Sequence, residues 1–462
     1  MASPPPDTLL SLGAPPVTRP WSSLRRPLFR RGDRFVGLTG RFLQGTLLLI
    51  LVTLGCQVAA VAVSPLLTRL YEPADFGVLG VFLAICSPLM AVASLRYECA
   101  IPLPRDDGDA LAVLLLSGLL SLTFAGLLSL SLLFIGAPLA SAFQLPVLAN
   151  YLWVLPFAVL FGGWYSALSY WNLRKKEYGH VATSRGAETL GRIVTECGLG
   201  VAGWQPAGLL AAQALAKIYA TLVLALRLPW NALQFDRRQF SNVVAAARLH
   251  RRFPTMATPA TIANTVSGNL PCLLMPLLFG PVEAGFFLIG QRLASWPIAL
   301  FGQAIAQVFY SELSSHEVSP DEKRRLFYRL SLLLMLGAVA ISTLFLAAPL
   351  WCGLLLGEKW QSAGAIVAAL TPMLVGQLVV SPLSMAYYAN GKQHILLALD
   401  AARVVLTGLV FAVSWFISLS ATNCILAFSM SLAAIYAIHW LMIASFFHEH
   451  VDHEAVTLPP PT

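Results

Sequence analysis

Charged side chains lie inside stretches of this sequence that are otherwise apolar, and these residues are the candidates for chemistry. Glu188, Arg192 and Glu196 follow one another at intervals of four residues within residues 182–203. This spacing places them on one face of a helix. A charge near the centre of a bilayer costs at least about 2.5 kcal/mol, so it usually faces a cavity or a charged partner. The stripe therefore predicts either a polar cavity or a set of ion pairs that only neutralise one another.

Other charges occupy similar positions elsewhere in the chain. Lys217 lies near the middle of residues 207–226, and Arg292 lies about a third of the way into 284–309. Neither has an opposite charge within one turn of its own helix, whereas Asp400 and Arg403 are three residues apart and can pair. The unpaired charges are positive, and the guanidinium group has forked donors that suit oxyanions. This pattern favours an anionic substrate.

The composition explains why these charges stand out. Hydrophobic residues make up 57% of the 462 residues, charged residues make up 11%, and the mean hydropathy is +0.72. Soluble proteins carry roughly 25% charged residues. The composition therefore excludes a soluble enzyme, a disordered chain and a nucleic-acid-binding module, and it predicts an all-α polytopic membrane protein.

A spanning helix needs about 20 mainly apolar residues. On this basis the sequence predicts about twelve transmembrane helices, of which 182–203 is the most highly charged. Their predicted ranges are 44–68, 76–95, 110–135, 150–170, 182–203, 207–226, 255–280, 284–309, 327–352, 363–387, 394–417 and 422–447.

The distribution of Lys and Arg predicts the orientation. If the N-terminus is cytoplasmic, the outer loops hold only Arg69 and Lys359, and the remaining loop cations lie inside. This bias agrees with the positive-inside rule. We therefore expect both termini in the cytoplasm, and we interpret the Arg- and Pro-rich segment 1–43 as a cytoplasmic tail without a signal peptide.

The predicted domains follow from the spans and from an internal repeat. Ser64-Pro65-Leu66-Leu67 precedes Glu72-Pro73-Ala74-Asp75-Phe76-Gly77, and Met275-Pro276-Leu277-Leu278 precedes Glu283-Ala284-Gly285-Phe286, at an offset of about 210 residues. Six spans per copy make the repeat parallel. We expect two six-helix bundles, 44–226 and 255–447, around a central cavity. A cytoplasmic linker at 227–254, interpreted as an amphipathic interfacial helix, would join them, and 448–462 would form a second tail.

Two segments carry a family resemblance. SPLLTRLYEPADFG (64–77) and LRYECAIPLPRDDGDA (95–110) resemble the opening of Wzx-type oligosaccharide flippases. These flippases belong to the multidrug/oligosaccharidyl-lipid/polysaccharide exporter superfamily, which includes the MATE transporters. The match covers the first 110 residues, and an RxxxxP pattern at Arg292–Pro297 extends it loosely. The tail 1–43 is longer than the family pattern requires.

The resemblance implies a bacterial inner-membrane flippase for surface polysaccharide biosynthesis. Its substrate would be an undecaprenyl-diphosphate-linked oligosaccharide, moved from the cytoplasmic to the outer leaflet by alternating access, and other polysaccharide assembly proteins are possible partners. Cations would bind the diphosphate, amides would bind sugar hydroxyls, and an indole would stack on a sugar face. The candidates are Arg292, Lys217, Arg192 and Arg403 for the first role, Gln57, Asn264, Gln303 and Gln377 for the second, and Trp296 for the third.

A carboxylate in the membrane is a candidate for coupling transport to a cation. Burial favours the neutral form of a carboxyl group, so such a group can load and release a proton near neutral pH. Glu188, Glu196 and Asp400 are the candidates, with H⁺ or Na⁺ as the coupling ion.

The sequence contains none of the motifs that would indicate other chemistry. It has no GxxxxGK[ST] phosphate loop, no GxSxG, no HExxH and no paired-Cys zinc pattern, so we expect no catalysis, cofactor or metal site. A drug or cation antiporter of the same superfamily is the alternative, and it would favour acidic groups in the cavity. A membrane-embedded polymerase or glycosyltransferase would need a sizeable outer loop or an acidic loop motif, and the sequence has neither.

Overall fold

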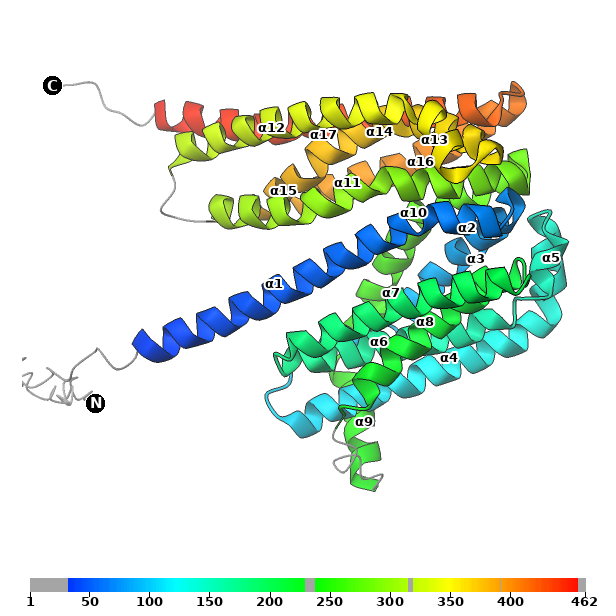
Figure 1. The fold of residues 1–462 in the computed structure, drawn as a ribbon. Helices are drawn as coiled ribbons and strands as arrows, with labels where there is room; N and C mark the ends of the chain where they lie inside the picture. Colours follow the sequence, from blue (N-terminus) through cyan, green and yellow to red (C-terminus); the bar gives the residue numbers. More distant parts are fainter. Residues whose placement is uncertain (1–31, 229–236, 315–318, 391, 456–462) are drawn as a thin grey trace, which may run out of the picture. The chain divides into compact units, whose positions relative to one another are not determined.

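The computed structural model describes residues 32–228, 237–314, 319–390 and 392–455, and all regular elements in these ranges are helical (Figure 1). Along parts of α1, α9, α11, α16 and α17 only the backbone is described. The helices are α1 (Gly32–Ala62), α2 (Ser64–Leu70), α3 (Pro73–Val92), α4 (Asp107–Ala142), α5 (Pro146–Ala149), α6 (Val154–Arg174), α7 (Tyr178–Val201), α8 (Ala207–Ala225), α9 (Arg237–Leu249), α10 (Thr258–Phe279), α11 (Pro281–Ser314), α12 (Pro320–Leu346), α13 (Ala348–Leu356), α14 (Gln361–Leu383), α15 (Met385–Ala389), α16 (Gln393–Phe416) and α17 (Ala421–Ala455). Short turns of 3₁₀ helix, η2 (Tyr97–Ala100) and η5 (Glu358–Trp360), and a π turn, η4 (Phe253–Ala257), join some of them.

The chain divides into two compact units, residues 1–45 and 46–462. The first unit is described only from Gly32, where α1 begins. All contacts discussed below lie within the second unit.

In the described part of the chain, nine helical segments are long and apolar enough to cross a membrane. They are formed by α1–α2, α3, α4, α8, η4–α10, α12, η5–α14–α15, α16 and α17. The other three predicted spans are also helical, as α6 with 21 residues, α7 with 24 and α11 with 34. Helices therefore occupy all twelve predicted ranges, and the expected all-α, multi-pass membrane fold is confirmed.

Three predicted spans are interrupted near a proline. The tenth stops at Leu383, after Pro382, and resumes as α15 at Met385. The other two resume just before a proline. The first span stops at Ala62 and resumes as α2 at Ser64, and Pro65 lies in the first turn of α2. The ninth stops at Leu346 and resumes as α13 at Ala348, and Pro349 follows. Proline has no backbone N–H and fits the first turn of a helix, so it favours a new start over a continuous helix.

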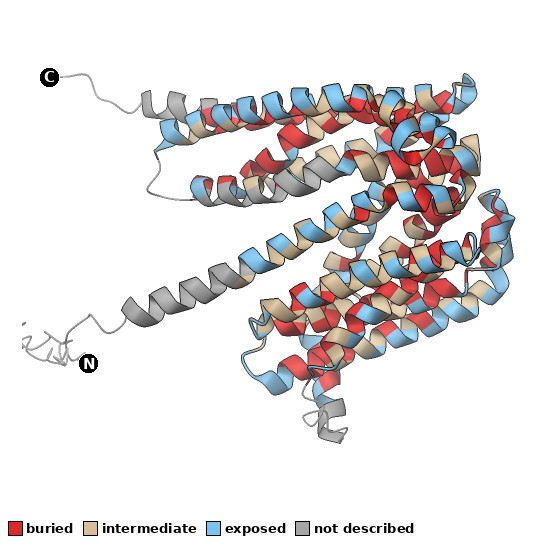
Figure 2. Cartoon of the chain, viewed as in Figure 1, coloured by how far each residue is buried: buried red, intermediate tan, exposed pale blue. Residues whose placement is uncertain are grey.

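Large apolar side chains lie exposed along several helices, as expected for a surface in contact with lipid tails. Leu133 and Phe134 of α4 are 79% and 76% exposed, and Leu354 of α13 is 82% exposed. In Figure 2 the exposed residues form long runs on the outward faces of α4 and α12. In water such a surface would be strongly unfavourable, so it supports insertion in a bilayer.

The interior of the second unit is organised around α3. This helix packs against α6 and α8 on one side and against α10 and α11 on the other. Its side chains Phe76, Val81 and Phe82 are at most 1% exposed. Close packing on both sides makes α3 a central element, next to which the candidate site is formed.

Candidate functional site

A cavity of about 390 Å³ lies among α1, α3, α7, α8 and α11. Apolar residues of α3 and α11 form part of its wall. The polar side chains in its lining are those of Gln57, Arg192, Glu196, Gln213, Gln291, Arg292 and Ser295. Four of the predicted site residues, Gln57, Arg192, Glu196 and Arg292, are therefore brought together in one cavity.

Glu196 is the acidic member of this cavity, and its side chain is 1% exposed. Its Oε1 accepts a hydrogen bond from Nε2 of Gln213 at 3.2 Å, whereas its Oε2 has no hydrogen-bond partner among the described residues. The charges of Arg192 and Arg292 both act on this carboxylate. Glu196 thus keeps one free oxygen in an electropositive setting.

Arg292 and Arg192 supply the cations from two different helices. Arg292 of α11 donates one hydrogen bond from Nη2 to the carbonyl oxygen of Ala60 in α1, at 2.7 Å. Arg192 of α7 forms no hydrogen bond or salt bridge in the described part of the chain. Because a guanidinium group has five N–H donors, both side chains retain donors for a ligand.

The backbone around Glu196 is held by Tyr71, which lies between α2 and α3. The Tyr71 hydroxyl donates to the carbonyl oxygen of Glu196 at 2.7 Å, and the side chain is fully buried. Burial raises the pKa of Tyr71, so its hydroxyl stays protonated as a donor. This bond fixes α7 against the end of α2.

One end of the cavity is closed by aromatic packing. Phe76, which lines the cavity, meets the indole of Trp360 edge to face at 5.2 Å between ring centroids, and Phe286 meets it at 5.8 Å. Trp360 also donates from Nε1 to the carbonyl oxygen of Thr68 at 2.9 Å. Nearby, Lys359 and Glu72 form a salt bridge at 2.8 Å. These contacts join α2 and α3 to η5 and α11 on the side of the predicted outer loops.

The backbones of α3 and α11 make an unusually close approach at the same end. A Cβ atom at Gly77 would overlap the carbonyl oxygen of Pro281, and a Cβ atom at Gly285 would overlap the carbonyl oxygen of Pro73. Gly77 and Gly285 are 208 positions apart, as are Pro73 and Pro281. The two contacts are therefore equivalent: replacing each residue of one contact by its counterpart 208 positions away gives the other contact. In this register PxDxG (73–77) matches PxExG (281–285). The offset in this register is 208, close to the predicted value of about 210, and the matched segments begin at Pro73 and Pro281.

Lys217 was predicted to be a free cation in the cavity, but the structure places it elsewhere. Its Nζ forms a salt bridge with Oε1 of Glu188 at 2.5 Å and lies 4.9 Å from the centroid of the Tyr165 ring. Neither Lys217 nor Glu188 lines the cavity described above. The two residues join α7 to α8, so their observed contact is structural.

Asp400 and Arg403 form the predicted pair within α16, at 3.2 Å. The Arg403 guanidinium also lies 5.4 Å from the centroid of the Tyr436 ring. Beside them, His439 of α17 is 3% exposed, and neither of its ring nitrogens has a hydrogen-bond partner in the described residues. This second polar cluster lies apart from the cavity of Arg292 and Glu196.

Two of the remaining predicted site residues do not join the cavity. Asn264 of α10 is exposed, and Gln377 of α14 is partly buried. Neither lines the cavity. Trp296 and Gln303 lie on α11, but their side chains are outside the described residues. Their assignment stays a prediction.

Three polar cavity residues were not predicted. One of them, Ser295, donates a hydrogen bond to the carbonyl oxygen of Arg292 within α11, at 3.2 Å. Gln213 lies four residues before Lys217, so the two residues share one side of α8. Gln291 directly precedes Arg292 and accepts a hydrogen bond from the Cys272 thiol at 3.5 Å. Nothing in the local sequence distinguishes Gln291 from other glutamines, because its position depends on how α10 and α11 pack.

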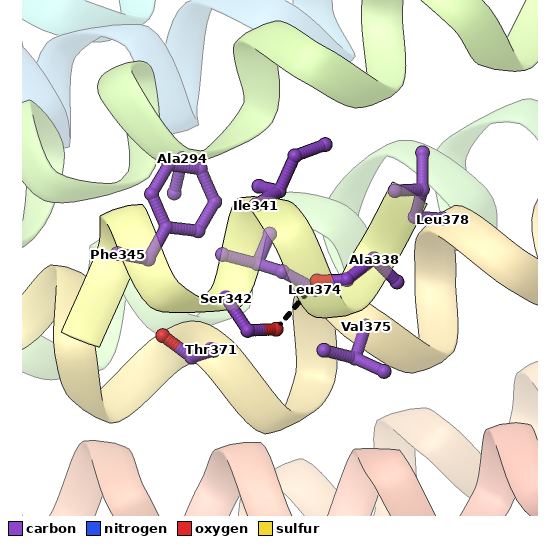
Figure 3. Close-up of a pocket in the computed structure, with 9 residues that line it drawn as sticks. All are labelled: Ala294, Ala338, Ile341, Ser342, Phe345, Thr371, Leu374, Val375 and Leu378. Carbon is purple, nitrogen blue, oxygen red and sulfur yellow. Dashed lines mark hydrogen bonds between the residues drawn. The ribbon is translucent and has the colours of Figure 1, made fainter. Parts of the chain in front are cut away.

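Another cavity, between α11, α12 and α14, is too small and too apolar to hold substrate (Figure 3). Its volume is about 10 Å³. Its two hydroxyl groups are used within their own helices, because Ser342 donates to the carbonyl of Ala338 and Thr371 donates to that of Val367. This space is a packing gap.

Several transporters of known structure are similar to this chain. An inward-facing multidrug resistance transporter of the MATE family, in the MOP superfamily, gives a TM-score of 0.67 at 13% identity and covers 89% of this chain and 96% of its own. The lipid II flippase MurJ, in an inward closed conformation, gives a TM-score of 0.61 at 11% identity and covers 91% of this chain and 93% of its own. An outward-facing MATE-family multidrug resistance transporter gives a TM-score of 0.54 at 12% identity and covers 91% of this chain and 96% of its own. At these identities the likeness establishes the fold.

The sequence comparisons establish the family. No curated protein sequence matches the chain. The family model described as "Polysaccharide biosynthesis protein" matches residues 66–365, which is more than half of the chain. This match includes every polar and charged residue of the cavity lining except Gln57. The chain is therefore a member of this polysaccharide biosynthesis family, with the fold of the MOP-superfamily transporters.

Proposed function

We propose that this protein moves an undecaprenyl-diphosphate-linked oligosaccharide from the cytoplasmic to the outer leaflet of a bacterial inner membrane, for surface polysaccharide assembly. The family match and the transporter fold support transport of a lipid-linked sugar. The single observation that carries the choice of substrate is the pair of arginines, Arg192 and Arg292, beside Glu196 in one cavity. Two cations and one carboxylate give this lining a positive balance, which suits an anion.

The geometry assigns a role to each part of the cavity. Arg192 and the free donors of Arg292 would bind the diphosphate, because charge-assisted bonds to phosphate are strong and directional. Gln57, Gln213 and Gln291 would bind sugar hydroxyls. The lipid tail would remain in the bilayer beside the cavity, where its transfer into a polar space would be unfavourable. Arg403, Lys217, Trp296, Asn264, Gln303 and Gln377 remain secondary candidates.

Glu196 is the candidate for coupling to a cation. Its free Oε2 can take up a proton, and the loss of its negative charge would leave both arginines without an internal counter-charge. Glu188 and Asp400 are engaged in salt bridges and are less available for this role. The proposed ion is H⁺, with Na⁺ as the alternative.

Alternating access by two six-helix bundles, 44–226 and 255–447 with the linker 227–254, is part of the proposal, as are the cytoplasmic termini. The aromatic and glycine contacts that join α3 to α11 and η5 support a state closed on the outer side. The higher TM-scores to the inward-facing MATE structure and to inward closed MurJ than to the outward-facing MATE structure agree with such a state.

The proposal is tested in a strain that lacks its own polysaccharide flippase. Expression of this protein should restore surface polysaccharide, and Arg292→Gln or Arg192→Gln should reduce it about tenfold or more, because a hydrogen bond to a charged group contributes about 1.5–3 kcal/mol. Arg329→Gln, at an exposed site on α12, is the matched control. Full rescue by Arg292→Gln and Arg192→Gln at normal protein level would refute the assignment of the cavity.

A drug or cation antiporter remains the second candidate because of the similarity to a MATE transporter. The same protein in proteoliposomes should not exchange organic cations if the substrate is anionic. Export of an organic cation that is abolished by Glu196→Gln, together with a failure to restore polysaccharide, would favour the antiporter.

A further inference from the structure

The amphipathic helix α9 lies against the end of α4 that carries the charged N-terminal turn (Figure 1). Val243 and Ala246 are each 8% exposed and pack into a cluster with residues of η2 and the first turns of α4. The hydroxyl of Tyr97 donates to the carbonyl oxygen of Ala247 at 2.9 Å. The helix is thus fixed to the protein by one face, and its other faces remain available.

A groove of about 470 Å³ lies along one side of α9. Leu116 of α4 and Val243, Val244 and Ala247 of α9 form its apolar lining. Arg248 and Arg251 are the charged residues at its border. The volume falls in the range of sites that bind small molecules.

The groove continues toward the surface of α4 that faces lipid. Leu119 lies one helical turn beyond Leu116 and is 47% exposed. Leu122 follows at the same spacing and is 50% exposed. Residues three apart lie on the same side of a helix, so an apolar path leads from the groove along α4. A hydrocarbon chain can reach the groove from the bilayer without crossing a polar surface.

The cations at the border of the groove have no counter-charge among the described residues. Arg248, Arg251 and Arg252 are exposed, and none forms a salt bridge within the described residues. Burial lowers the pKa of the neighbouring His250, so the positive charge of this region comes from the arginines. The acidic side chain of Asp109 lines a different cavity, on the other side of α9. The groove therefore combines an apolar floor with a basic border that no acidic side chain in the described part of the chain neutralises.

We propose that this groove binds one anionic phospholipid of the surrounding bilayer. An acyl chain would lie on Leu116, Val244 and Ala247 and continue along Leu119, while the phosphate would bind Arg248 and Arg251. Exposed Leu249 and Met256, at 77% and 70%, flank the arginines, and this mixture of apolar and basic groups is typical of segments at a membrane surface. The inference is independent of the transported substrate.

The test is native mass spectrometry of the full-length protein with added phosphatidylglycerol or phosphatidylcholine. The unmodified chain should retain one phosphatidylglycerol preferentially. Arg248→Gln/Arg251→Gln should weaken that binding about tenfold or more, since it removes both cations that would bind the phosphate. Ala247→Trp, which fills the apolar floor and keeps both charges, should displace the same lipid.

The exposed pair on α12 serves as the matched control, as Arg325→Gln/Arg329→Gln. This double variant should leave phosphatidylglycerol binding unchanged. Equal losses in the control and in Arg248→Gln/Arg251→Gln would show a diffuse charge effect and overturn the site. If the unmodified chain retained phosphatidylcholine as well as phosphatidylglycerol, the role of charge in the site would be overturned. Displacement of phosphatidylglycerol by an equimolar amount of undecaprenyl diphosphate would instead assign the groove to the lipid-linked substrate and overturn the phospholipid assignment.

Discussion

Gly77 and Gly285 make the same close approach in opposite directions: each lies against the carbonyl of the proline that begins the other glycine's helix. Gly80 faces the residue that occupies the equivalent position in the other repeat. A Cβ atom at Gly80 would lie 3.7 Å from Leu288, which is also 208 positions away. Such reciprocity is expected where two copies of a repeat meet around a pseudo-two-fold axis. The contact lies at the end of the cavity that Phe76 and Trp360 close.

We predict that Gly77→Val opens the cavity at this end. A side chain at Gly77 would overlap a backbone oxygen, and a backbone atom cannot move aside by changing a rotamer. The two helices would have to separate, which favours the outward-open state. With Ser295→Cys as the reporter in a cysteine-free chain, a membrane-impermeant maleimide added outside should label the variant several times faster than the Ser295→Cys parent.

Gly80→Ala is the control for this experiment. It adds a methyl group on the same helix, but at an ordinary van der Waals distance from Leu288. Its labelling should match that of the parent. If Gly77→Val is also labelled at the parent rate while it is present at normal level, the glycine contact does not control access.

The second prediction concerns the pair between Glu188 and Lys217, whose side chains are 24% and 20% exposed. Glu188→Gln should lower the free energy of unfolding by about 2 kcal/mol, because it leaves a largely buried ammonium group without its partner. The double variant Glu188→Gln/Lys217→Gln should recover most of this loss, since neither charge then remains. Unfolding of the detergent-solubilised protein, followed by thiol exposure, measures both. An unchanged midpoint in Glu188→Gln would contradict a structural role for the pair.

This pair shows what spacing along one helix can and cannot predict. The interval of four residues correctly placed Glu188, Arg192 and Glu196 on one face of α7. It did not reveal that the face divides, with Glu188 turned to α8 and Arg192 and Glu196 turned to the cavity. Lys217 had no acid within a turn of its own helix, yet it has one on the neighbouring helix. That information lies in the packing of α7 on α8.

The spans were predictable for a different physical reason. A segment that spans a bilayer needs about 20 apolar residues, and its backbone N–H and C=O groups must be paired within the protein, as they are in a helix. Composition alone therefore indicates these elements. The ends were less predictable, because Pro65 and Pro349 restart helices inside two ranges that were predicted as continuous. The register of the repeat could not be predicted from the sequence either. Its glycines and prolines became recognisable as partners only through their contact.

The third prediction is that Glu196→Gln uncouples transport from the proton gradient. Glutamine keeps an acceptor for Gln213 and a similar volume, but it cannot take up a proton. In proteoliposomes, an imposed pH gradient should change the rate of lipid-linked oligosaccharide translocation by the unmodified chain and should leave Glu196→Gln unaffected. Asp400→Asn should respond to the gradient as the unmodified chain does. A full response by Glu196→Gln would remove Glu196 from the coupling mechanism.

The last prediction concerns His439, whose ring lies 5.8 Å from that of Tyr387 and 6.2 Å from that of Tyr436. A buried polar group without a partner destabilises the folded state by about 1–3 kcal/mol. His439→Phe removes that penalty and keeps the aromatic contacts, so it should raise the midpoint of thermal unfolding. The adjacent Trp440 donates from Nε1 to the Ser331 hydroxyl at 3.1 Å, so Trp440→Phe should lower the midpoint. A lower midpoint for His439→Phe would mean that the imidazole has a polar partner in the membrane, such as a bound water or ion.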